Sequence, residues 1–214
     1  MKKRAFCLVL SLILLFCVPV QADGRNFFRR LQYGTLSPYE NFVYHYSLKI
    51  YDRFEMIPDE MLDVLWQHLD EDHDENSANV YDIRFWVSQD GRYQFETQVK
   101  EPTYASFDIE IAKAPEYADL VRDSYPEDSN LRMLHEGILR STPAGDMLET
   151  AVAYDSADDD GHIYTTVFVY YDIYANGVEY CFSLYAYDGD YKAAQAMLDD
   201  ICQTVELTPM AVPA

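Results

Sequence analysis

The residues that could perform chemistry in this 214-residue chain do not complete a familiar catalytic motif. His135 and Glu136 begin like the helix of a zinc protease, but that motif needs a second histidine where Leu139 stands. The sequence also contains no G-x-S-x-G nucleophile elbow and no glycine-rich phosphate loop. We therefore expect no catalytic residue and no cofactor.

Two acidic segments have some features of a cation site. Residues 156–167 align with a calcium-binding loop through Asp158, Asp160 and Gly161, but the last position of such a loop requires glutamate and is Val167. A second segment, residues 68–73, joins two histidines to several carboxylates just beyond a predicted helix. Both patterns are more typical of solvated loops, and we expect no structural metal.

Two cysteines outside the N-terminal apolar segment, Cys181 and Cys202, are candidates for a disulfide. Cys181 lies early in a predicted strand and Cys202 late in the helix that follows, so the two thiols end at the same level of the domain. A bond needs Cα atoms within about 7 Å, whereas a helix and a sheet usually lie about 10 Å apart. The sequence leaves open a disulfide or two separate buried thiols.

Tyrosines are informative because they gather on one side of a predicted hairpin. Asn176-Gly177 predicts a two-residue type I′ turn between strands at 163–174 and 178–187. This turn places an apolar set on one face, the core, and on the other face the candidate ligand-binding residues Tyr170, Tyr174, Tyr185 and Tyr187. The tyrosine face also carries Asp172 and Glu179, so complete burial would leave charges that need partners. Either a ligand binds this face through rings and hydroxyls, or a helix covers it.

The N-terminus predicts export. Three basic residues at positions 2–4 precede an apolar run over residues 5–20, and a small-residue cleavage site ends at Ala22. The run contains Pro19 and is shorter than the ~20 residues that span a bilayer. We expect a signal peptide over residues 1–22, and the alternative is an uncleaved signal anchor.

The mature chain is expected to be strongly acidic. Removal of the signal peptide leaves 13 of the 16 basic residues against all 37 acidic ones, a net charge of −24. Such a charge repels phosphate backbones and anionic lipids, so we expect no nucleic-acid partner and no membrane insertion after signal cleavage. The expected location is extracytoplasmic, either secreted or at the cell surface, and the expected partner is a protein or glycan found there.

The rest of the sequence predicts one α+β domain. We expect an irregular lead-in over residues 23–43, a single domain over 44–207 and a tail over 208–214. Helices are expected to begin at Pro58 and Pro115 and to span residues 191–202. Strands, mostly paired in hairpins, are expected at 44–52, 80–100 as one hairpin, 107–112, 131–141, 147–154, 163–174, 178–187 and 204–207. Hairpins with helices between them are typical of a mostly antiparallel sheet flanked by helices.

One further hairpin, closed by Gln89-Asp90-Gly91, can be given a register from its apolar residues. A three-residue turn would pair Phe85 with Phe95 and place all the large apolar side chains on one face. The reverse face would then set Arg84 opposite Glu96 as a cross-strand ion pair.

The order of elements from Phe107 onward resembles the PsbP-like fold, a group that includes extrinsic photosystem subunits and many exported bacterial domains. The matching order is a strand, a helix, a hairpin, a long hairpin closed by Asn176-Gly177, a C-terminal helix and a last strand. The resemblance covers about the last half of the chain and rests on no motif, so it transfers no functional residue. It implies an αβα sandwich, and a binding or assembly role more often than catalysis.

We therefore expect an exported, non-enzymatic binding or accessory domain. The alternative is an extracytoplasmic hydrolase, such as a glycosidase, that uses two of the 37 acidic residues. A pair of opposed carboxylates about 5–10 Å apart in a deep cleft would favour the hydrolase. A shallow surface with exposed tyrosines would favour the binding domain.

Overall fold

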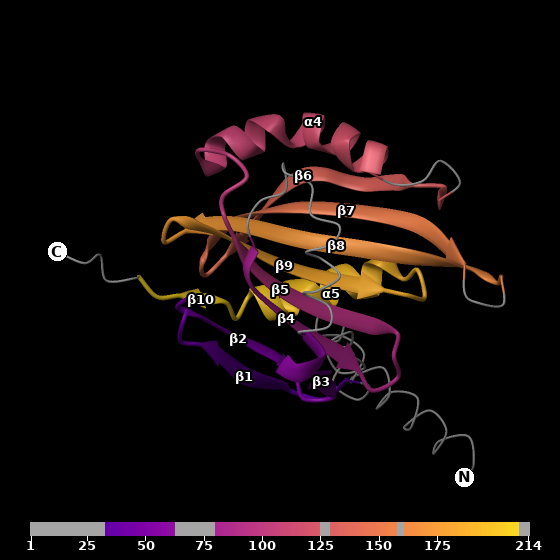
Figure 1. The fold of residues 1–214 in the computed structure, drawn as a ribbon, viewed down its shortest axis with the longest axis horizontal. Helices are drawn as coiled ribbons and strands as arrows, with labels where there is room; N and C mark the ends of the chain where they lie inside the picture. Colours follow the sequence, from indigo (N-terminus) through magenta and orange to yellow (C-terminus); the bar gives the residue numbers. More distant parts are fainter. Residues whose placement is uncertain (1–32, 63–79, 125–128, 158–160, 210–214) are drawn as a thin grey trace, which may run out of the picture.

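The computed structural model consists of two antiparallel sheets with helices packed against them (Figure 1). It describes residues 33–62, 80–124, 129–157 and 161–209, with the backbone alone for 117–124. The elements in chain order are β1 (Leu36–Asn41), β2 (Tyr46–Tyr51), β3 (Phe54–Met56), β4 (Val80–Ser88), β5 (Tyr93–Lys100), α4 (Phe107–Ser124), β6 (Arg132–Thr142), β7 (Gly145–Ala157), β8 (Ile163–Ala175), β9 (Val178–Ala186), α5 (Tyr191–Cys202) and β10 (Glu206–Leu207). Within the described ranges, no helix has the length and apolar composition needed to cross a membrane.

The layers follow from the two sheets. A seven-stranded sheet has the order β3-β4-β5-β9-β8-β7-β6, and a three-stranded sheet has the order β1-β2-β10. Helix α4 lies on one face of the large sheet, beside β6, whereas α5 and the small sheet pack against the opposite face (Figure 1). The expected fold class, an α+β sandwich around a mostly antiparallel sheet, is confirmed.

The main core lies between the large sheet and the layer formed by α5 and the small sheet. Helix α5 contributes Met197, Leu198 and Ile201, which are fully buried and recur at helical spacing. They belong to the same apolar cluster as Val169 and Tyr171 of β8. Burial of each such side chain contributes roughly 1.5–3 kcal/mol to the stability of the fold. This face of the sheet is filled by core side chains and is not available to a ligand.

The hairpin of β8 and β9 has the predicted turn and register. Asn176 and Gly177 have φ angles of 56° and 76°, as a type I′ turn requires. Phe168 lies opposite Tyr185, and Tyr170 lies opposite Ser183. The predicted division into an apolar core face and a tyrosine face is therefore confirmed.

The predicted register of the β4–β5 hairpin is wrong by one residue. Trp86, not Phe85, lies opposite Phe95, and Phe85 lies opposite Glu96. Both faces of this hairpin are buried, because Trp86 enters the main core while Phe85 joins a second apolar cluster. Arg84 consequently does not pair with Glu96.

Arg84 instead forms ion pairs on its own side of the sheet. Its guanidinium group lies 3.0 Å from Asp82 Oδ1 and also contacts Asp59. Asp59 opens the short stretch of the predicted Pro58 helix that is described, residues 59–62. The rest of that helix lies outside the described residues.

Three other expectations about local structure are wrong. The helix expected to begin at Pro115 begins at Phe107, and Pro115 lies inside it. Residues 107–112, predicted as a strand, form the start of α4, because the backbone carbonyl of Ser106 accepts from the amides of Ile109 and Glu110 at 3.1 and 3.2 Å. The helix buries Glu110 and exposes Ile109, so the apolar alternation did not mark the buried side. Residues 36–41, predicted as part of an irregular lead-in, form β1 and pair with β2.

Candidate functional site

The face of the large sheet on the side of α4 has two chemically different parts. Near the Asn176-Gly177 turn, acidic side chains from β8, β9 and α4 line a small cavity, which we call the acidic cavity. Toward the other end of β8 and β9, five aromatic residues form what we call the aromatic end: Tyr154, Tyr164, Phe168, Tyr185 and Tyr187.

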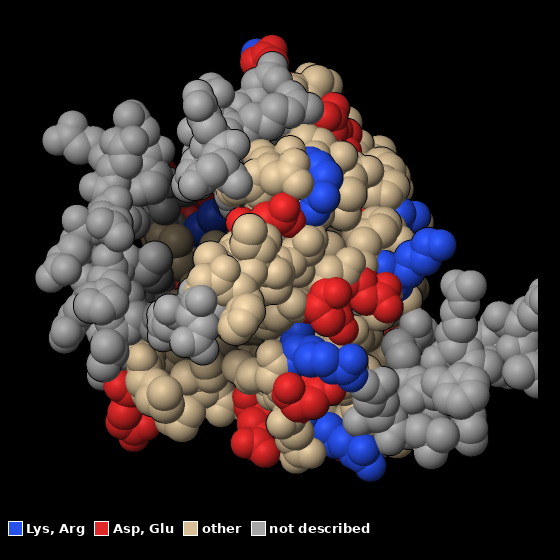
Figure 2. All heavy atoms as spheres, turned by 90° about the vertical axis from the view of Figure 1, so that its right-hand side faces the viewer, with Lys and Arg blue, Asp and Glu red and all other residues tan. Residues whose placement is uncertain are grey.

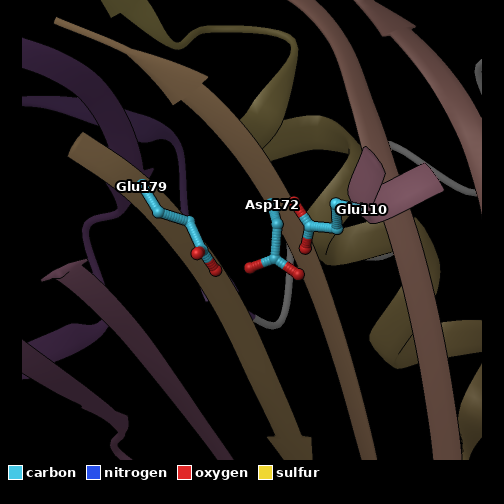
Figure 3. A group of neighbouring side chains, drawn as sticks. All are labelled: Glu110, Asp172 and Glu179. Atoms are coloured by element: carbon cyan, nitrogen blue, oxygen red, sulfur yellow. The ribbon is translucent and has the colours of Figure 1, made fainter. Parts of the chain in front are cut away.

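Three acidic residues from three elements meet in the acidic cavity (Figure 3). Glu110 comes from α4, Asp172 from β8 and Glu179 from β9, and one carboxylate oxygen of each lies within 4.8 Å of the others. Their exposed fractions are 9%, 4% and 1%. Because Tyr174 lies opposite Glu179 in the ladder, Asp172 and Glu179 are diagonal neighbours on one face.

Lys100 of β5 is the one cationic side chain among the described residues that line the acidic cavity. It lies opposite Glu179 in the β5–β9 ladder, and its Nζ is 2.7 Å from Glu179 Oε1. Burial opposes the ammonium charge, but the carboxylates of Asp172 and Glu179 raise the pKa of Lys100, so it stays charged. The amide of Thr103 donates to Glu179 Oε2 at 2.9 Å, so both oxygens of Glu179 have partners.

Asp172 and Glu110 are less well satisfied. Asp172 hydrogen-bonds the thiol of Cys181, and Glu110 hydrogen-bonds the hydroxyl of Tyr174. The other oxygens, Asp172 Oδ1 and Glu110 Oε2, are buried without a hydrogen-bond partner in the part of the chain that the structure describes. Burial raises the pKa of Asp172, and burial together with the charges of Asp172 and Glu179 raises the pKa of Glu110 to about 8.

The cavity between these side chains is small. Its volume is about 20 Å³, which is room for about one water-sized group. Tyr170 and Leu148 are among its walls, together with Ala114 of α4. The arrangement can hold a proton, a water molecule or a single ion, but not an organic substrate.

The aromatic end is a row of stacked rings. The rings of Phe168 and Tyr185 have centroids 4.4 Å apart and lie within 25° of parallel, and Tyr187 continues the row at 6.3 Å and 13°. All three are half-buried. The hydroxyl of Tyr187 donates to Gln94 Oε1 at 3.2 Å, and its pKa is raised by burial and then by the nearby hydroxyls of Tyr154 and Tyr164.

The four tyrosines expected to bind a ligand do not form one open surface. Tyr185 and Tyr187 lie together at the aromatic end, whereas Tyr170 is 6% exposed and lines the acidic cavity. Tyr174 packs against Phe107 of α4, with ring centroids 5.7 Å apart, and its hydroxyl accepts from the amide of Tyr104 at 2.9 Å. Helix α4 thus covers half of the predicted face.

The other candidate residues from the sequence have different positions. Cys181 and Cys202 are free, buried thiols on opposite faces of the large sheet, Cys181 beside Asp172 and Cys202 in the main core. Of the calcium-like segment 156–167, residues 158–160 lie outside the described residues, and so does the whole histidine segment 68–73. The predicted signal peptide, residues 1–22, also lies outside them.

A second buried acid lies on the core side of the sheet. Glu149 of β7 is 0% exposed and accepts from Gln195 Nε2 at 2.8 Å and from the Tyr191 hydroxyl at 3.1 Å. It also pairs with Arg140 and receives the hydroxyl of Tyr171 at 3.4 Å. This fully bonded group joins α5 to the sheet and has no oxygen free for a ligand.

Only part of the acidic cavity could be predicted from the sequence. Register placed Asp172 and Glu179 on the tyrosine face and indicated that they need partners. Glu110 was missed because its segment was interpreted as a strand, and Lys100 was missed because only the β5–β9 pairing brings it to Glu179. A serine cap at Ser106 ahead of acidic residues was the available signal for the helix.

Comparison with known proteins identifies the fold. No protein-family model and no curated protein matches the sequence. The structure is similar to cyanobacterial PsbP (CyanoP) from Synechocystis sp. PCC 6803, with a TM-score of 0.50, 10% identity, and coverage of 81% of this chain and 93% of that chain. At this identity the similarity establishes the fold alone, and the chain has the PsbP-like fold that its element order predicted.

Two further solved structures show weaker similarity. The Ran-binding protein Mog1p from Saccharomyces cerevisiae has a TM-score of 0.48 and 12% identity, covering 82% of this chain and 96% of that one. LpqN, involved in cell envelope biogenesis of Mycobacterium tuberculosis, has a TM-score of 0.37 and 13% identity, covering 81% and 86%. Both scores are below 0.5, and we draw no conclusion from them.

Proposed function

We propose that the protein is an exported, non-enzymatic binding or accessory domain that docks a protein partner at its aromatic end. The observation that supports this most is the row of half-buried, stacked rings formed by Phe168, Tyr185 and Tyr187. Tyrosine is enriched at protein interfaces because a large apolar ring carries a hydrogen-bonding hydroxyl.

The orientation of the rings favours a protein over a glycan. A sugar binds an aromatic platform by lying flat on an open ring face. Here the ring faces of Phe168, Tyr185 and Tyr187 are turned toward one another, at centroid distances of 4.4 and 6.3 Å. The exposed parts of these half-buried rings suit contact with the apolar side chains of a protein partner.

The charge of the chain indicates the chemistry of that partner. The expected mature chain carries a net charge of −24, which attracts a partner with a basic surface and accelerates its association. The charge is not concentrated in one place on the face shown in Figure 2, where acidic side chains lie among basic ones. Long-range attraction therefore brings the partner near, and the aromatic end provides the contact.

The acidic cavity does not favour the alternative, a glycosidase-like hydrolase. The carboxylates of Glu110, Asp172 and Glu179 lie within 4.8 Å of one another, closer than the ~5–10 Å that flanks a glycosidic bond. The cavity volume of about 20 Å³ is far below that of a sugar ring. This supports a binding role.

Site-specific photocrosslinking in the producing cells tests the proposal. A photoreactive phenylalanine replaces Tyr164, which is 39% exposed at the aromatic end, and in a matched control it replaces Phe42, which is 76% exposed in the turn before β2. We expect a discrete protein adduct from position 164 that is absent at position 42, and loss of this adduct when Tyr185→Ala is added. A protease-resistant adduct would indicate a glycan, and equal adducts at both positions would contradict docking at the aromatic end.

A further inference from the structure

The acidic cavity holds more negative charge than its own cation can neutralise. Glu110, Asp172 and Glu179 bring three carboxylates, whereas Lys100 brings the one ammonium group among the residues that line the cavity. Lys100 is already engaged with Glu179 at 2.7 Å. Burying unpaired charge is costly because the protein interior solvates it poorly. When all three carboxylates are ionised, two negative charges in the cavity are left, and they must be balanced either by bound protons or by a cation.

Two buried oxygens indicate where a ligand would bind. Among the described residues, Asp172 Oδ1 and Glu110 Oε2 have no hydrogen-bond partner, although their side chains are only 4% and 9% exposed. Buried polar atoms of this kind nearly always have a partner in folded proteins. Figure 3 shows the carboxylate of Asp172 between those of Glu179 and Glu110, so one positively charged ligand beside it can contact both Asp172 and Glu110.

From this geometry we propose that the acidic cavity binds one Ca²⁺ ion between α4 and the β8–β9 hairpin. The three acidic residues offer oxygen donors, which Ca²⁺ and Mg²⁺ prefer, rather than the nitrogen and sulfur donors typical of zinc. With Lys100 present, a doubly charged cation brings the cavity to neutrality.

The dimensions favour Ca²⁺ over Mg²⁺. Two oxygens that bind one Ca²⁺ at about 2.3–2.6 Å can lie up to about 5 Å apart, whereas Mg²⁺ allows only about 4 Å. The carboxylate oxygens lie within 4.8 Å of one another, a span that is within the reach of Ca²⁺. The volume of about 20 Å³ leaves space for at most about one water, and Mg²⁺ usually keeps several.

Ion binding in this position would couple to the docking of α4. Glu110 is the ligand that α4 supplies, whereas Asp172 and Glu179 belong to the hairpin beneath it. An ion held by all three ties the helix to the sheet and stabilises the folded protein in proportion to its concentration. The acidic cavity is separate from the aromatic end, so either proposal can fail without the other.

Calorimetric titration and thermal unfolding of the purified protein, stripped with chelator and studied at pH 7.5, test the proposal. We expect one Ca²⁺ per chain and an increase in Tm of at least about 5 °C at saturating Ca²⁺, with a smaller effect of Mg²⁺. Tb³⁺, which replaces Ca²⁺ on oxygen ligands, should show emission sensitised by the tyrosines that line the cavity, Tyr170 among them.

Asp172→Asn separates a ligand role from a structural one. The substitution keeps the shape of the side chain and removes one charge, so in chelator the variant should melt at or above the Tm of the native protein. In saturating Ca²⁺ the order should reverse, because only the native protein gains stability. Glu110→Gln should behave in the same way. A control with Asp158→Asn and Asp160→Asn in the acidic segment 156–167 should bind Ca²⁺ like the native protein.

Three results would overturn the proposal. One is a native protein whose Tm and heat signal do not respond to Ca²⁺ up to about 10 mM, beyond the weakest usual protein sites. Another is loss of binding in the Asp158 and Asp160 control while Asp172→Asn still binds. The third is an increase in Tm from Asp172→Asn that is equal with and without Ca²⁺. This result would show that a shared proton, rather than an ion, neutralises the negative charge of the cavity.

Discussion

Glu96, on the α4 side of the large sheet, provides a direct test of how burial makes stability depend on pH. It lies on β5 between Phe85 of β4 and Ser183 of β9, and it is 4% exposed. Burial raises the pKa of its carboxyl from 4.5 to about 7, and the hydrogen bond from Gln98 offsets only part of this effect. The folded protein therefore holds the Glu96 proton more tightly than the unfolded chain does.

The sign of the pH dependence follows from this difference. The contribution of Glu96 to stability is complete below about pH 4.5 and is lost as the pH rises through about 7. One pKa unit corresponds to about 1.4 kcal/mol, so the free energy of unfolding should fall by about 2–3 kcal/mol between pH 5 and pH 8 because of this one residue.

Glu96→Gln should abolish that part of the loss, because the amide keeps the shape of the side chain and carries no titrating proton. Urea unfolding of the native protein and the variant at pH 5 and pH 8 measures this effect. The free energy of unfolding of the variant, relative to that of the native protein, should increase by about 2–3 kcal/mol from pH 5 to pH 8. Glu40→Gln, on exposed strand β1, removes the same charge from the surface as a control. A relative stability of Glu96→Gln that is the same at both pH values would refute the reasoning.

Three more measurements address packing, the aromatic end and export. Gly137 has φ +69°, and a Cβ there would lie 2.4 Å from the Cβ of Ala114 on α4. Gly137→Ala should therefore lower the free energy of unfolding, measured in urea, by about 2–4 kcal/mol, and adding Ala114→Gly should recover part of this loss. Strictly additive effects of the two substitutions would exclude the contact as the cause. Tyr185→Ala should cost about 1–2 kcal/mol, because the half-buried ring stacks on its neighbours, and a loss above about 3 kcal/mol would place the ring in the core. N-terminal sequencing of secreted protein should begin at Asp23, and an intact N-terminus would indicate a signal anchor.

The elements that were predictable from the sequence are those fixed by local chemistry. Asn176-Gly177 permits one tight turn, and this turn determines which side chains of β8 and β9 share a face. Helix α5 was predicted with its observed bounds, since its apolar residues recur at helical spacing over 12 residues and Asp190 caps its first turn.

The failures have a common physical origin in burial on two sides. The β4–β5 register was chosen to bury one face, but Trp86 and Phe85 are both buried, on opposite faces. In this hairpin the apolar Phe85 of β4 lies opposite the acidic Glu96 of β5, so matching apolar side chains across the two strands gives the wrong register. The start of α4 failed for a related reason, because the residue that it turns toward the sheet is the acidic Glu110 rather than an apolar one.

The acidic cavity could be predicted only in part because its members come from separate elements. Register alone placed Asp172 and Glu179 side by side. Lys100 reaches them through the pairing of β5 with β9, which joins strands almost 80 residues apart in sequence, and Glu110 reaches them through the packing of α4. Neither contact leaves a local pattern in the sequence.

The large sheet buries acidic groups on both faces, and the difference between them distinguishes a structural role from a ligand role. On the core side, Glu149 is matched by an arginine, two hydroxyls and an amide, so its burial is balanced by partners that join α5 to the sheet. Under α4, three carboxylates share one lysine, and two of their oxygens have no partner among the described side chains. Burial of charge is tolerated when partners balance it, and the described residues supply enough of them only on the core side. Because both groups belong to the same sheet, the imbalance on the α4 side points to a ligand rather than to a general acidity of the fold.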